Sequence, residues 1–517
     1  MLMLLKEEKT MNLPDIKFGK LIYKEHEGKN VYVHSYSEVE SDDYNSYIEA
    51  LTNEGYEKKE NYMIACNSFT VHEKEDTFVL AVYYPTVKEM RIITSLSCSW
   101  QTYEDNPCDE KTECLLTQIN IEDHGMSYLL RLSDGRFIIF DGGWEFDIDA
   151  DKLFACMKEQ SPHDKPIIAS WIMTHPHIDH YRCYLSFNKK YAQEVRLQSF
   201  IYNFPDTTDD DIKKMPDLDT GSEHEYLSMR RFYDAVCQTG APVYRAHTGQ
   251  IFNIGNAKLE ILSSPDDTFF VPVTSFNPLS LVIRMTIENQ TILWCADASF
   301  EEAKLAERWG TYLKSDILQV PHHGFCGGDA KTYNLIDPTT CFYPVEEICF
   351  ANIDIYREHN RHLLYNLNVE DCFTSTVGNL TVKLPYYPRK NGRRMLLDTV
   401  REYEKNVGAK SWYFEGLSRN ECDFTFINSV AADADIMADL IFEDPSNNVN
   451  AIKIISPAAR VLKANILNPE DADHDALYNN RASLKKRGLP KDAIFTVHFR
   501  SNVPVVIKGR KEATYFN

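Results

Sequence analysis

The chain has 517 residues, of which 43% are hydrophobic and 26% are charged, a composition that is ordinary for a soluble globular enzyme of two or three domains. Its formal net charge of −22 disfavours polymeric DNA or RNA as a substrate, because an anionic surface repels a phosphate backbone, although a small anionic substrate stays compatible with a local metal charge. No apolar run approaches membrane-spanning length, so we expect no membrane partner, and the 13 scattered cysteines without a CxxC pair favour a reducing compartment and a cytoplasmic location.

Residues 1–110 are predicted to form a small N-terminal α+β domain. Apolar residues at helical spacing indicate an amphipathic helix that ends at a glycine; they are Tyr44, Tyr47, Ile48 and Leu51, with Gly55 after them. Strand-like runs follow at 62–65, 77–84 and 90–94, and the polar stretch 103–111 is typical of a linker. Nothing in this domain indicates chemistry, so packing, dimerisation and substrate capping stay open as its role.

Residues 111–390 contain every chemical motif of the chain. Strands and helices alternate here, which predicts a layered α/β domain. Within it, the segment Asp206–Glu225 is acidic and rich in turn residues, which indicates either a solvated surface insertion or a mobile lid. Residues 391–517 are predicted to start with a helix at 395–405 and to continue as a β-rich C-terminal domain, with short strands such as 451–455 and 493–499.

The densest set of metal-binding side chains follows the apolar run 166–173, which predicts a buried strand. His175, His177, Asp179 and His180 fall within six residues on the turn that leaves this strand. Imidazole nitrogens and carboxylate oxygens are ligands that suit zinc and its neighbours. Because alternate residues of an extended turn point the same way, His175 and His177 can bind one ion, and Asp179 and His180 can bind a second. A histidine-rich loop without metal is the alternative.

Two carboxylates lie at the ends of other predicted strands. A hairpin over 125–143 ends its second strand at Asp141, which either holds the metal loop through hydrogen bonds or is a turn residue before two glycines. Asp297 follows the strand-like run 291–296, and its two oxygens can bridge two cations.

Two pairs of histidines follow later in the chain. His322 and His323 come directly after another apolar strand and before a glycine. His359 and His362 share one face of a predicted helix, as surface or capping residues or as residues that contact the substrate.

In this order, the strand ending Asp-Gly-Gly, the HxHxDH motif, the strand ending in Asp and the strand ending in His-Gly resemble the metallo-β-lactamase superfamily over residues 113–388, roughly half of the chain. The sequence Val320-Pro-His-His-Gly324, with Asn277 and Ser280 upstream, is most similar to the branch of DNA-uptake competence proteins and phosphodiesterase-like relatives. The resemblance implies an αββα sandwich, in which two sheets pack face to face with helices outside.

The resemblance also implies a ligand set, position by position. His175 and His177 belong on the first metal, Asp179 and His180 belong on the second, Asp297 bridges both, and His323 completes the second ion, with His322 as the alternative to His323. The family often places another histidine on the first metal.

The further ligand of the first metal stays open among His247, His224 and Asn277. Tyr181 and Cys183 stand next to the motif, where many relatives have glycine, so either residue lines the site or packs in the core. A general acid from the protein is not visible in the sequence, and Tyr181 and His247 are the candidates for one.

Two neighbouring cations can hold a hydroxide between them, with Asp179 as the catalytic residue that orients it. The leading prediction is therefore a binuclear metal-dependent hydrolase, with two zinc ions or with manganese or iron in their place, acting on a small-molecule substrate. A phosphate ester or phosphodiester is preferred through the branch resemblance. The alternatives are a lactone or thioester hydrolase, a metal-bound interaction protein with little turnover, and a di-iron redox protein, although neither flanking domain shows a flavin signature.

Overall fold

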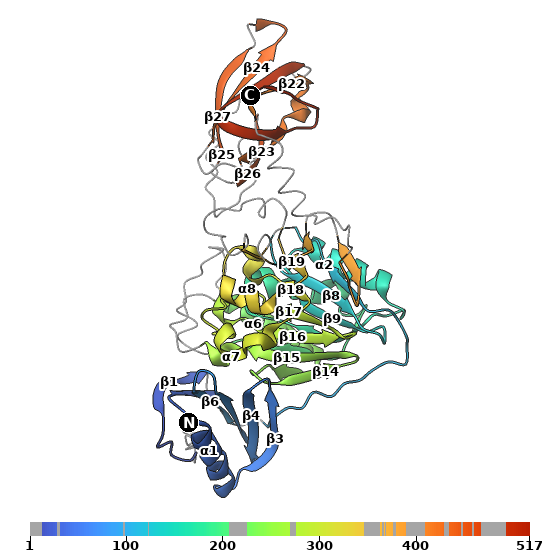
Figure 1. Cartoon of the computed structure of the whole chain (residues 1–517). Coiled ribbons are helices and arrows are strands. Elements are labelled where there is room, and N and C mark those ends of the chain that lie inside the picture. Colours follow the sequence, from blue (N-terminus) through green and yellow to red (C-terminus); the bar gives the residue numbers. More distant parts are fainter. Residues whose placement is uncertain are drawn as a thin grey trace, which may run out of the picture. The chain divides into compact units, whose positions relative to one another are not determined.

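The computed structural model describes residues 13–27, 31–96, 99–122, 124–205, 225–268, 276–345, 362–363, 367, 369–375, 379–388, 409–428, 434–445, 448–456, 460–466 and 493–516. They form a mixed α/β structure with several sheets (Figure 1). The chain divides into two compact units. The first comprises Met1–Pro344, Leu367–Val369 and Val377–Pro388, and the second comprises Val345–Asn366, Glu370–Thr376 and Arg389–Asn517. The predicted boundaries at residues 110/111 and 390/391 stay predictions.

The first unit begins with an antiparallel sheet of order β1-β2-β6-β5-β4-β3. Its strands are β1 (Lys20–Glu27), β2 (Val31–Ser37), β3 (Glu57–Ile64), β4 (Asn67–Lys74), β5 (Thr77–Tyr84) and β6 (Glu89–Leu96). Helix α1 (Ser41–Asn53) lies across it, and the four apolar residues predicted to form its buried face are all buried. They pack on alternate residues of β5 and β6, such as Val79 and Ile92. The predicted helix is confirmed, the predicted strands at 77–84 and 90–94 lie in β5 and β6, and the one at 62–65 runs one residue past the end of β3.

Two further sheets follow in the first unit. One has the order β13-β12-β10-β9-β8-β7-β21, with β11 beside β10. Its strands are β7 (Leu115–Gln118), β8 (Ser127–Arg131), β9 (Phe137–Asp141), β10 (Ile167–Ile172), β11 (Arg196–Leu197), β12 (Phe200–Tyr202), β13 (Val243–Arg245) and β21 (Leu380–Lys383). The other runs β14-β15-β16-β17-β18-β19. Its strands are β14 (Ile251–Ile254), β15 (Ala257–Ser263), β16 (Val282–Ile287), β17 (Gln290–Trp294), β18 (Ile317–Gln319) and β19 (Thr340–Tyr343).

These two sheets pack face to face through a layer of aromatic side chains. Trp294 of β17 stacks on Phe140 of β9 with ring centroids 4.1 Å apart, and it meets the edge of Tyr128 of β8 at 5.1 Å. Phe342 of β19 lies 6.1 Å from the same Tyr128 ring. The side chains of both inner faces therefore interdigitate as in a β-sandwich.

Helices cover the outer faces of this sandwich (Figure 1). α2 (Asp147–Gln160), α4 (Cys183–Tyr191) and α6 (Glu225–Thr239) share one hydrophobic cluster with Trp171 of β10. On the other side, the Trp309 indole N–H of α7 (Leu305–Trp309) donates to the Leu262 carbonyl of β15 at 2.9 Å, and α8 (Ala330–Ile336) follows in the chain. At the level of layers, the helix–sheet–sheet–helix order expected from the sequence is present.

Buried charges join the N-terminal sheet to the sandwich within the first unit. Arg91 of β6 lies 3.0 Å from Asp267 of η1 (Pro265–Asp267), and Arg308 of α7 lies 3.3 Å from the same carboxylate. Glu89 of β6 pairs with Arg308 at 3.2 Å, and the Tyr84 hydroxyl donates to Asp267 at 2.9 Å. All five side chains are buried, so the two positive and two negative charges balance each other away from water.

The stretch predicted to be a linker is attached to the sandwich. Asp105 pairs with the buried Arg136 at 2.8 Å and accepts a hydrogen bond from the Gly255 amide at 2.7 Å. The Tyr103 hydroxyl donates to the Ala169 carbonyl at 3.3 Å. Residues 103–105 therefore lie along the surface of the central sheets. Within the described parts of the chain, none of the helices is both long enough and apolar enough to cross a membrane.

The second unit is mostly β-structure. Its sheet has the order β25-β24-β27-β22-β28, and β23 pairs with both β26 and β27. Its elements are β20 (Asp371–Thr374), β22 (Ala409–Leu417), η7 (Arg419–Glu421), β23 (Asp423–Asn428), β24 (Ala434–Phe442), β25 (Val449–Ser456), β26 (Arg460–Asn465), β27 (Phe495–Lys508) and β28 (Thr514–Phe516). The predicted strands at 451–455 and 493–499 fall on β25 and β27, whereas the predicted helix at 395–405 lies outside the described residues.

Candidate metal centre

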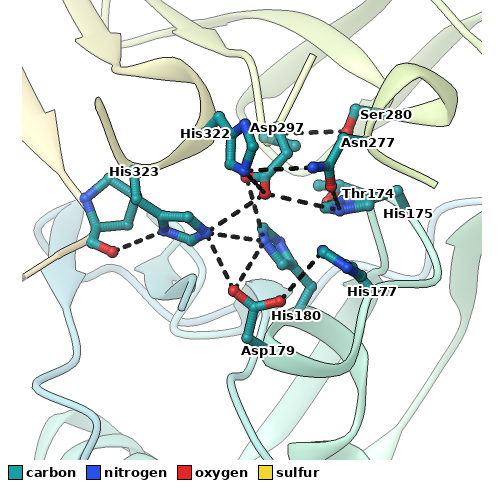
Figure 2. A network of polar contacts seen from close by, with 12 residues as sticks. Thr174, His175, His177, Asp179, His180, Asn277, Ser280, Asp297, His322 and His323 are labelled. Atoms are coloured by element: carbon teal, nitrogen blue, oxygen red, sulfur yellow. Dashed lines mark hydrogen bonds and ion pairs between the residues drawn. The ribbon is translucent and has the colours of Figure 1, made fainter. Parts of the chain in front are cut away.

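The polar side chains of the sequence motifs meet where parallel strands end. β9 and β10 are parallel, and so are β17 and β18, so the carboxyl ends of each pair lie at one edge. Asp141 ends β9, and the HxHxDH turn with α3 (Ile178–Tyr181) follows β10. Asp297 follows β17, and η4 (Pro321–Gly324), which holds two histidines, follows β18. Figure 2 shows the labelled histidine and carboxylate side chains, among them Asp179, His180, Asp297 and His323, converging on one site.

One set of donors consists of Asp179, His180 and His323, with one ligand atom from each residue within 4.8 Å of the others. The Nε2 atom of His323 lies 3.1 Å from Asp179 Oδ2 and 3.4 Å from His180 Nε2 (Figure 2). The third distance, from His180 Nε2 to Asp179 Oδ2, is 3.8 Å. The sequence analysis predicted these three residues as ligands of the second metal, with Asp297 as a fourth, bridging ligand.

A second set consists of His175, His180 and Asp297. Asp297 Oδ1 lies 3.2 Å from His180 Nε2, and Asp297 Oδ2 lies 3.9 Å from His175 Nε2. The Oδ2 atom also lies 3.4 Å from His323 Nε2. Asp297 thus contacts members of both sets with its two oxygens, which is the arrangement that a bridging ligand requires.

The donor sets fit a divalent cation. Two ligand atoms that are each about 2.0–2.1 Å from a tetrahedral zinc ion are roughly 3.3 Å apart, close to the shorter spacings in the two sets. Neither carboxylate oxygen of the buried Asp297 receives a hydrogen bond of good geometry within the described structure. A buried carboxylate needs a partner, and the imidazole nitrogens that face it are of a type that can bind a metal ion beside it.

The electrostatics of the cluster also indicate that its buried carboxylates need a positively charged partner. Burial opposes the charges of Asp179 and Asp297, but the neighbouring histidines outweigh burial and hold the pKa of both carboxyls well below the usual range. Burial also opposes protonation of His180 and His323, yet the carboxylates raise the pKa of His180 well above its usual value and that of His323 to about 10. The cluster therefore favours positive charge at His180 and His323, beside its two carboxylates.

Asp141, at the end of β9, orients the HxHxDH turn through hydrogen bonds. Its carboxylate accepts hydrogen bonds from the Thr174 amide at 2.8 Å, from the Thr174 hydroxyl at 2.7 Å and from His180 Nδ1 at 2.7 Å. The bond to Nδ1 leaves His180 Nε2 facing the other donors. Of the two interpretations of Asp141, the structure therefore favours the first, in which its carboxylate holds the HxHxDH turn through hydrogen bonds.

His323 is oriented in a similar way, because its Nδ1 donates to the Pro344 carbonyl at 2.8 Å. The backbone at this strand end is in the left-handed region, with φ of 46° at His322 and 54° at His323. Such conformations cost about 1–3 kcal/mol each outside glycine and occur often at functional sites. The strain is consistent with a turn shaped to present two imidazoles to one cluster.

The remaining predicted ligands lie at the edge of the two sets. The Nδ1 atom of His177 lies 3.5 Å from Asp179 Oδ1, and its ring centroid lies 5.5 Å from that of His175. Asn277, which begins η2 (Asn277–Leu279), bridges two imidazoles: its Oδ1 lies 3.2 Å from His175 Nε2, and its Nδ2 lies 3.2 Å from His322 Nε2. Of the two candidates for a further ligand that the structure describes, His247 and Asn277, Asn277 is the one whose contacts lie in the cluster.

His247 has its contacts elsewhere. Its Nδ1 lies 2.8 Å from Asp266 Oδ2, and its ring packs near Phe78 and Trp100. His224 and His359 lie outside the described residues, and His362 belongs to the second unit. The predicted roles of the last three residues therefore stay predictions.

Tyr181 and Cys183, considered as residues lining the site, lie in the hydrophobic core instead. Both side chains are fully buried. The Tyr181 ring packs against Phe204 and Phe232, and Cys183 lies against Gly142. Packing is the better interpretation because α3 and α4 turn these two side chains towards the helical layer, away from the donors.

His124 is a residue that the sequence analysis missed. Its Nε2 lies 3.9 Å from Asp179 Oδ2, and its ring lies 5.7 Å from that of His323. The position directly before Gly125, at the start of the hairpin that ends at Asp141, is the signal that could have identified it. His322, predicted only as an alternative to His323, also joins the cluster, with Nε2 3.7 Å from Asp297 Oδ2.

The fold and the donor sets define a layered α/β protein with a candidate metal centre. No family model and no curated protein matches the chain. Solved structures similar to it include a putative metal-dependent hydrolase from Parabacteroides distasonis, with 12% identity, a TM-score of 0.27, and coverage of 58% of this chain and 93% of that protein. The flavodiiron protein from Giardia intestinalis has 10% identity, a TM-score of 0.25, and coverage of 59% and 60%.

A third structure, the Anabaena sensory rhodopsin transducer, has 18% identity and a TM-score of 0.16, and the match covers 20% of this chain and 84% of that protein. At these identities and scores, the proposed function rests on the donor sets and not on the similarities.

Proposed function

We propose that the chain is a metallo-β-lactamase-like hydrolase with a binuclear metal centre, preferentially zinc, in the cytoplasm. The observation that carries this proposal is the convergence of two overlapping donor sets on the two oxygens of the buried Asp297. Imidazole and carboxylate ligands suit zinc and are also compatible with manganese or iron.

In this proposal, His175 and His177 would hold the first cation, and Asp179, His180 and His323 would hold the second. Asp297 would be shared by both. The 3.2 Å contact of Asn277 Oδ1 with His175 Nε2 supports Asn277 as the further group at the first cation, in preference to His247, which is engaged by Asp266.

The bound cations would acidify a water molecule and polarise the substrate oxygen. Asp179 is the proposed catalytic residue, because its carboxylate has one oxygen facing His177 and the other facing His323. In this position it can accept a hydrogen bond from the attacking water and so orient that water. Asp141 fixes the orientation of the His180 ring. Burial of the cluster excludes bulk water from the reacting groups.

The proposed substrate is a small molecule with a phosphate ester or phosphodiester bond, and we propose no membrane or polymeric nucleic-acid partner. The net charge of −22 supports a small substrate over a nucleic-acid polymer. Lactones and thioesters are the alternatives within the same chemistry, since a fold does not choose between them.

The experiment measures metal content and turnover of generic phosphodiester, lactone and β-lactam substrates by the native protein and by Asp179→Asn and Asp297→Asn. We expect stoichiometric metal in the native protein, turnover of the phosphodiester, and a loss of at least about 100-fold in both variants, comparable with removal of a principal catalytic group. The control is Glu301→Gln, which changes an exposed acid near Asp297 in the sequence. Equal turnover by the native protein and both variants would refute the proposal.

A further inference from the structure

The side chains around the donor sets differ in their access to solvent. His175, His180, Asp297 and His323 are at most 1% exposed, whereas the side chain of His322 is 22% exposed and that of His124 is 29% exposed. A substrate can therefore approach the buried donors beside His322 and His124, whose side chains are more exposed than that of His177 at 14%.

Two large aromatic rings lie on this accessible side. The Phe325 ring is 5.8 Å from the His323 ring and 5.9 Å from the His124 ring, between centroids. The Trp144 ring meets the His124 ring edge to face at 5.5 Å. Both residues are partly exposed. We refer to Trp144, His124 and Phe325 together as the aromatic rim.

The aromatic rim is held in place by the same segments that build the donor sets. The Trp144 indole N–H donates to the His124 carbonyl at 2.5 Å, and its ring stacks on Phe146 at 5.9 Å. The Gly143 amide, one residue before Trp144, donates to the His180 carbonyl at 3.0 Å, and the Phe325 amide donates to the His322 carbonyl at 2.6 Å. Rigid rings lose little entropy when they bind a ligand, so a rim built in this way is preorganised.

The nearby guanidinium groups are already paired. Glu145, which follows Trp144, lies 3.2 Å from Arg182 and 2.7 Å from Arg231. The single Glu145 carboxylate therefore engages both guanidinium groups and offsets one of their two positive charges. The surface that the rim offers beside the donors is aromatic in character.

We propose that the aromatic rim binds a planar aromatic group of the substrate, next to the bond that the candidate metal centre cleaves. This inference rests on the proposed function and narrows its substrate to phosphate esters or phosphodiesters that carry a flat ring. The phosphoryl oxygens would face the donor sets while the ring packs on Trp144 and Phe325. Stacking of a flat ring on an aromatic side chain strengthens binding by about 10-fold or more.

The test compares two phosphonates that differ only in this ring. Phenylphosphonate and methylphosphonate are titrated calorimetrically into the full chain, with and without zinc. We expect phenylphosphonate to bind at least about 10-fold more tightly. Trp144→Leu and Phe325→Leu should remove this preference at unchanged zinc content, whereas Trp144→Phe and Phe325→Tyr, which keep a ring, should retain it. Tyr387→Ala, which removes an exposed aromatic ring outside the rim, is the matched control.

The outcomes separate this inference from the proposed function. Equal affinity for the two phosphonates, or a preference that survives both leucine variants, overturns the role of the rim while zinc binding and hydrolysis stand. Failure of either phosphonate to bind also overturns it. If the chain binds no zinc, the proposed function fails, and a phenyl preference lost in Trp144→Leu and Phe325→Leu would still support the rim as an aromatic-binding site.

Discussion

Asp141 accepts hydrogen bonds from Thr174 and His180 and so fixes both the backbone before the histidine motif and one imidazole within it. It lies at the end of β9, whose five residues are all buried. A carboxylate in this position therefore orients the His180 ring and the backbone that leads into the candidate ligands.

We therefore expect Asp141→Asn to lower zinc affinity by about 10–100-fold without unfolding the protein, the usual effect of losing a group that orients a ligand. Competition with a chromophoric chelator measures the affinity, and circular dichroism checks the fold. Asp337→Asn, in an exposed pair with Lys314, is the control and should bind zinc as the native protein does. Unchanged affinity in Asp141→Asn would contradict the orienting role.

The imidazoles predict a pH dependence for the zinc-free protein. The pKa of His323 is raised to about 10, and an imidazole is near 6.5 when unfolded. The stabilising contribution is then fully present below about pH 6.5 and is lost as pH rises through about 10. We expect the Tm of the zinc-free protein to fall over this range, and zinc to abolish the fall because it replaces the proton. The same dependence of Tm on pH with and without zinc would contradict this coupling.

At the scale of elements, the hairpin of β8 and β9 holds the turn that carries Asp179. The Met126 amide donates to the Asp179 carbonyl at 3.2 Å, and this approach is close because Gly125 has no side chain. A Cβ at Gly125 would lie 2.6 Å from the same carbonyl oxygen, and the residue has a φ of +146°. The chain just before β8 therefore needs glycine at position 125 to approach the backbone of the HxHxDH turn.

Gly125→Ala should displace Asp179 and cost about 1–3 kcal/mol of stability from backbone strain alone, together with a loss of zinc affinity. Gly240→Ala is the matched control, since Gly240 also has a positive φ but its added Cβ would meet nothing within 4 Å. Urea unfolding and zinc titration of both variants separate strain from displacement. Equal zinc affinity in the two variants would show that the hairpin does not position Asp179.

The sequence could predict the elements whose signal is local. Apolar runs predicted the strands that end at Asp141 or lead to Asp297 and His323, and helical spacing predicted α1. These signals are local because the buried face of a strand or helix is formed by residues close together in the chain. Spacing could not decide which distant group joins His175, since that depends on how loops fold back. His247 was plausible by spacing yet pairs with Asp266, whereas Asn277 reaches the cluster.

The residues whose role the sequence left open, and the residue that it missed, depend on tertiary packing in the same way. Tyr181 and Cys183 stand next to the motif, but the orientation of one helical turn decides whether they face the donors or the core. His124 has no motif of its own and reaches Asp179 only because the hairpin folds over the turn. Such contacts are not encoded in any short window of sequence.

At the scale of the whole molecule, the buried charges between the N-terminal sheet and the sandwich are the most sensitive contact. Arg91→Met would leave the buried Asp267 and Glu89 with one guanidinium in place of two. Breaking a buried ion pair in this way typically costs about 3–5 kcal/mol. We expect this loss in chemical denaturation, with the two parts still unfolding in one transition.

Lys314→Met, which breaks the exposed pair with Asp337, should cost at most about 1 kcal/mol. A similarly small loss in Arg91→Met would mean that the N-terminal sheet contributes little to holding the sandwich.

The same charges constrain how the protein can be divided. A fragment beginning at residue 111 would contain every residue of the donor sets, yet it would keep Arg308 and Asp267 while losing Arg91, Glu89 and Tyr84. One arginine and one aspartate, buried in the intact chain, would then face solvent on a newly bared apolar surface. The smallest piece suited to recombinant production is accordingly one that retains the first six strands, however independent they look in the linear sequence.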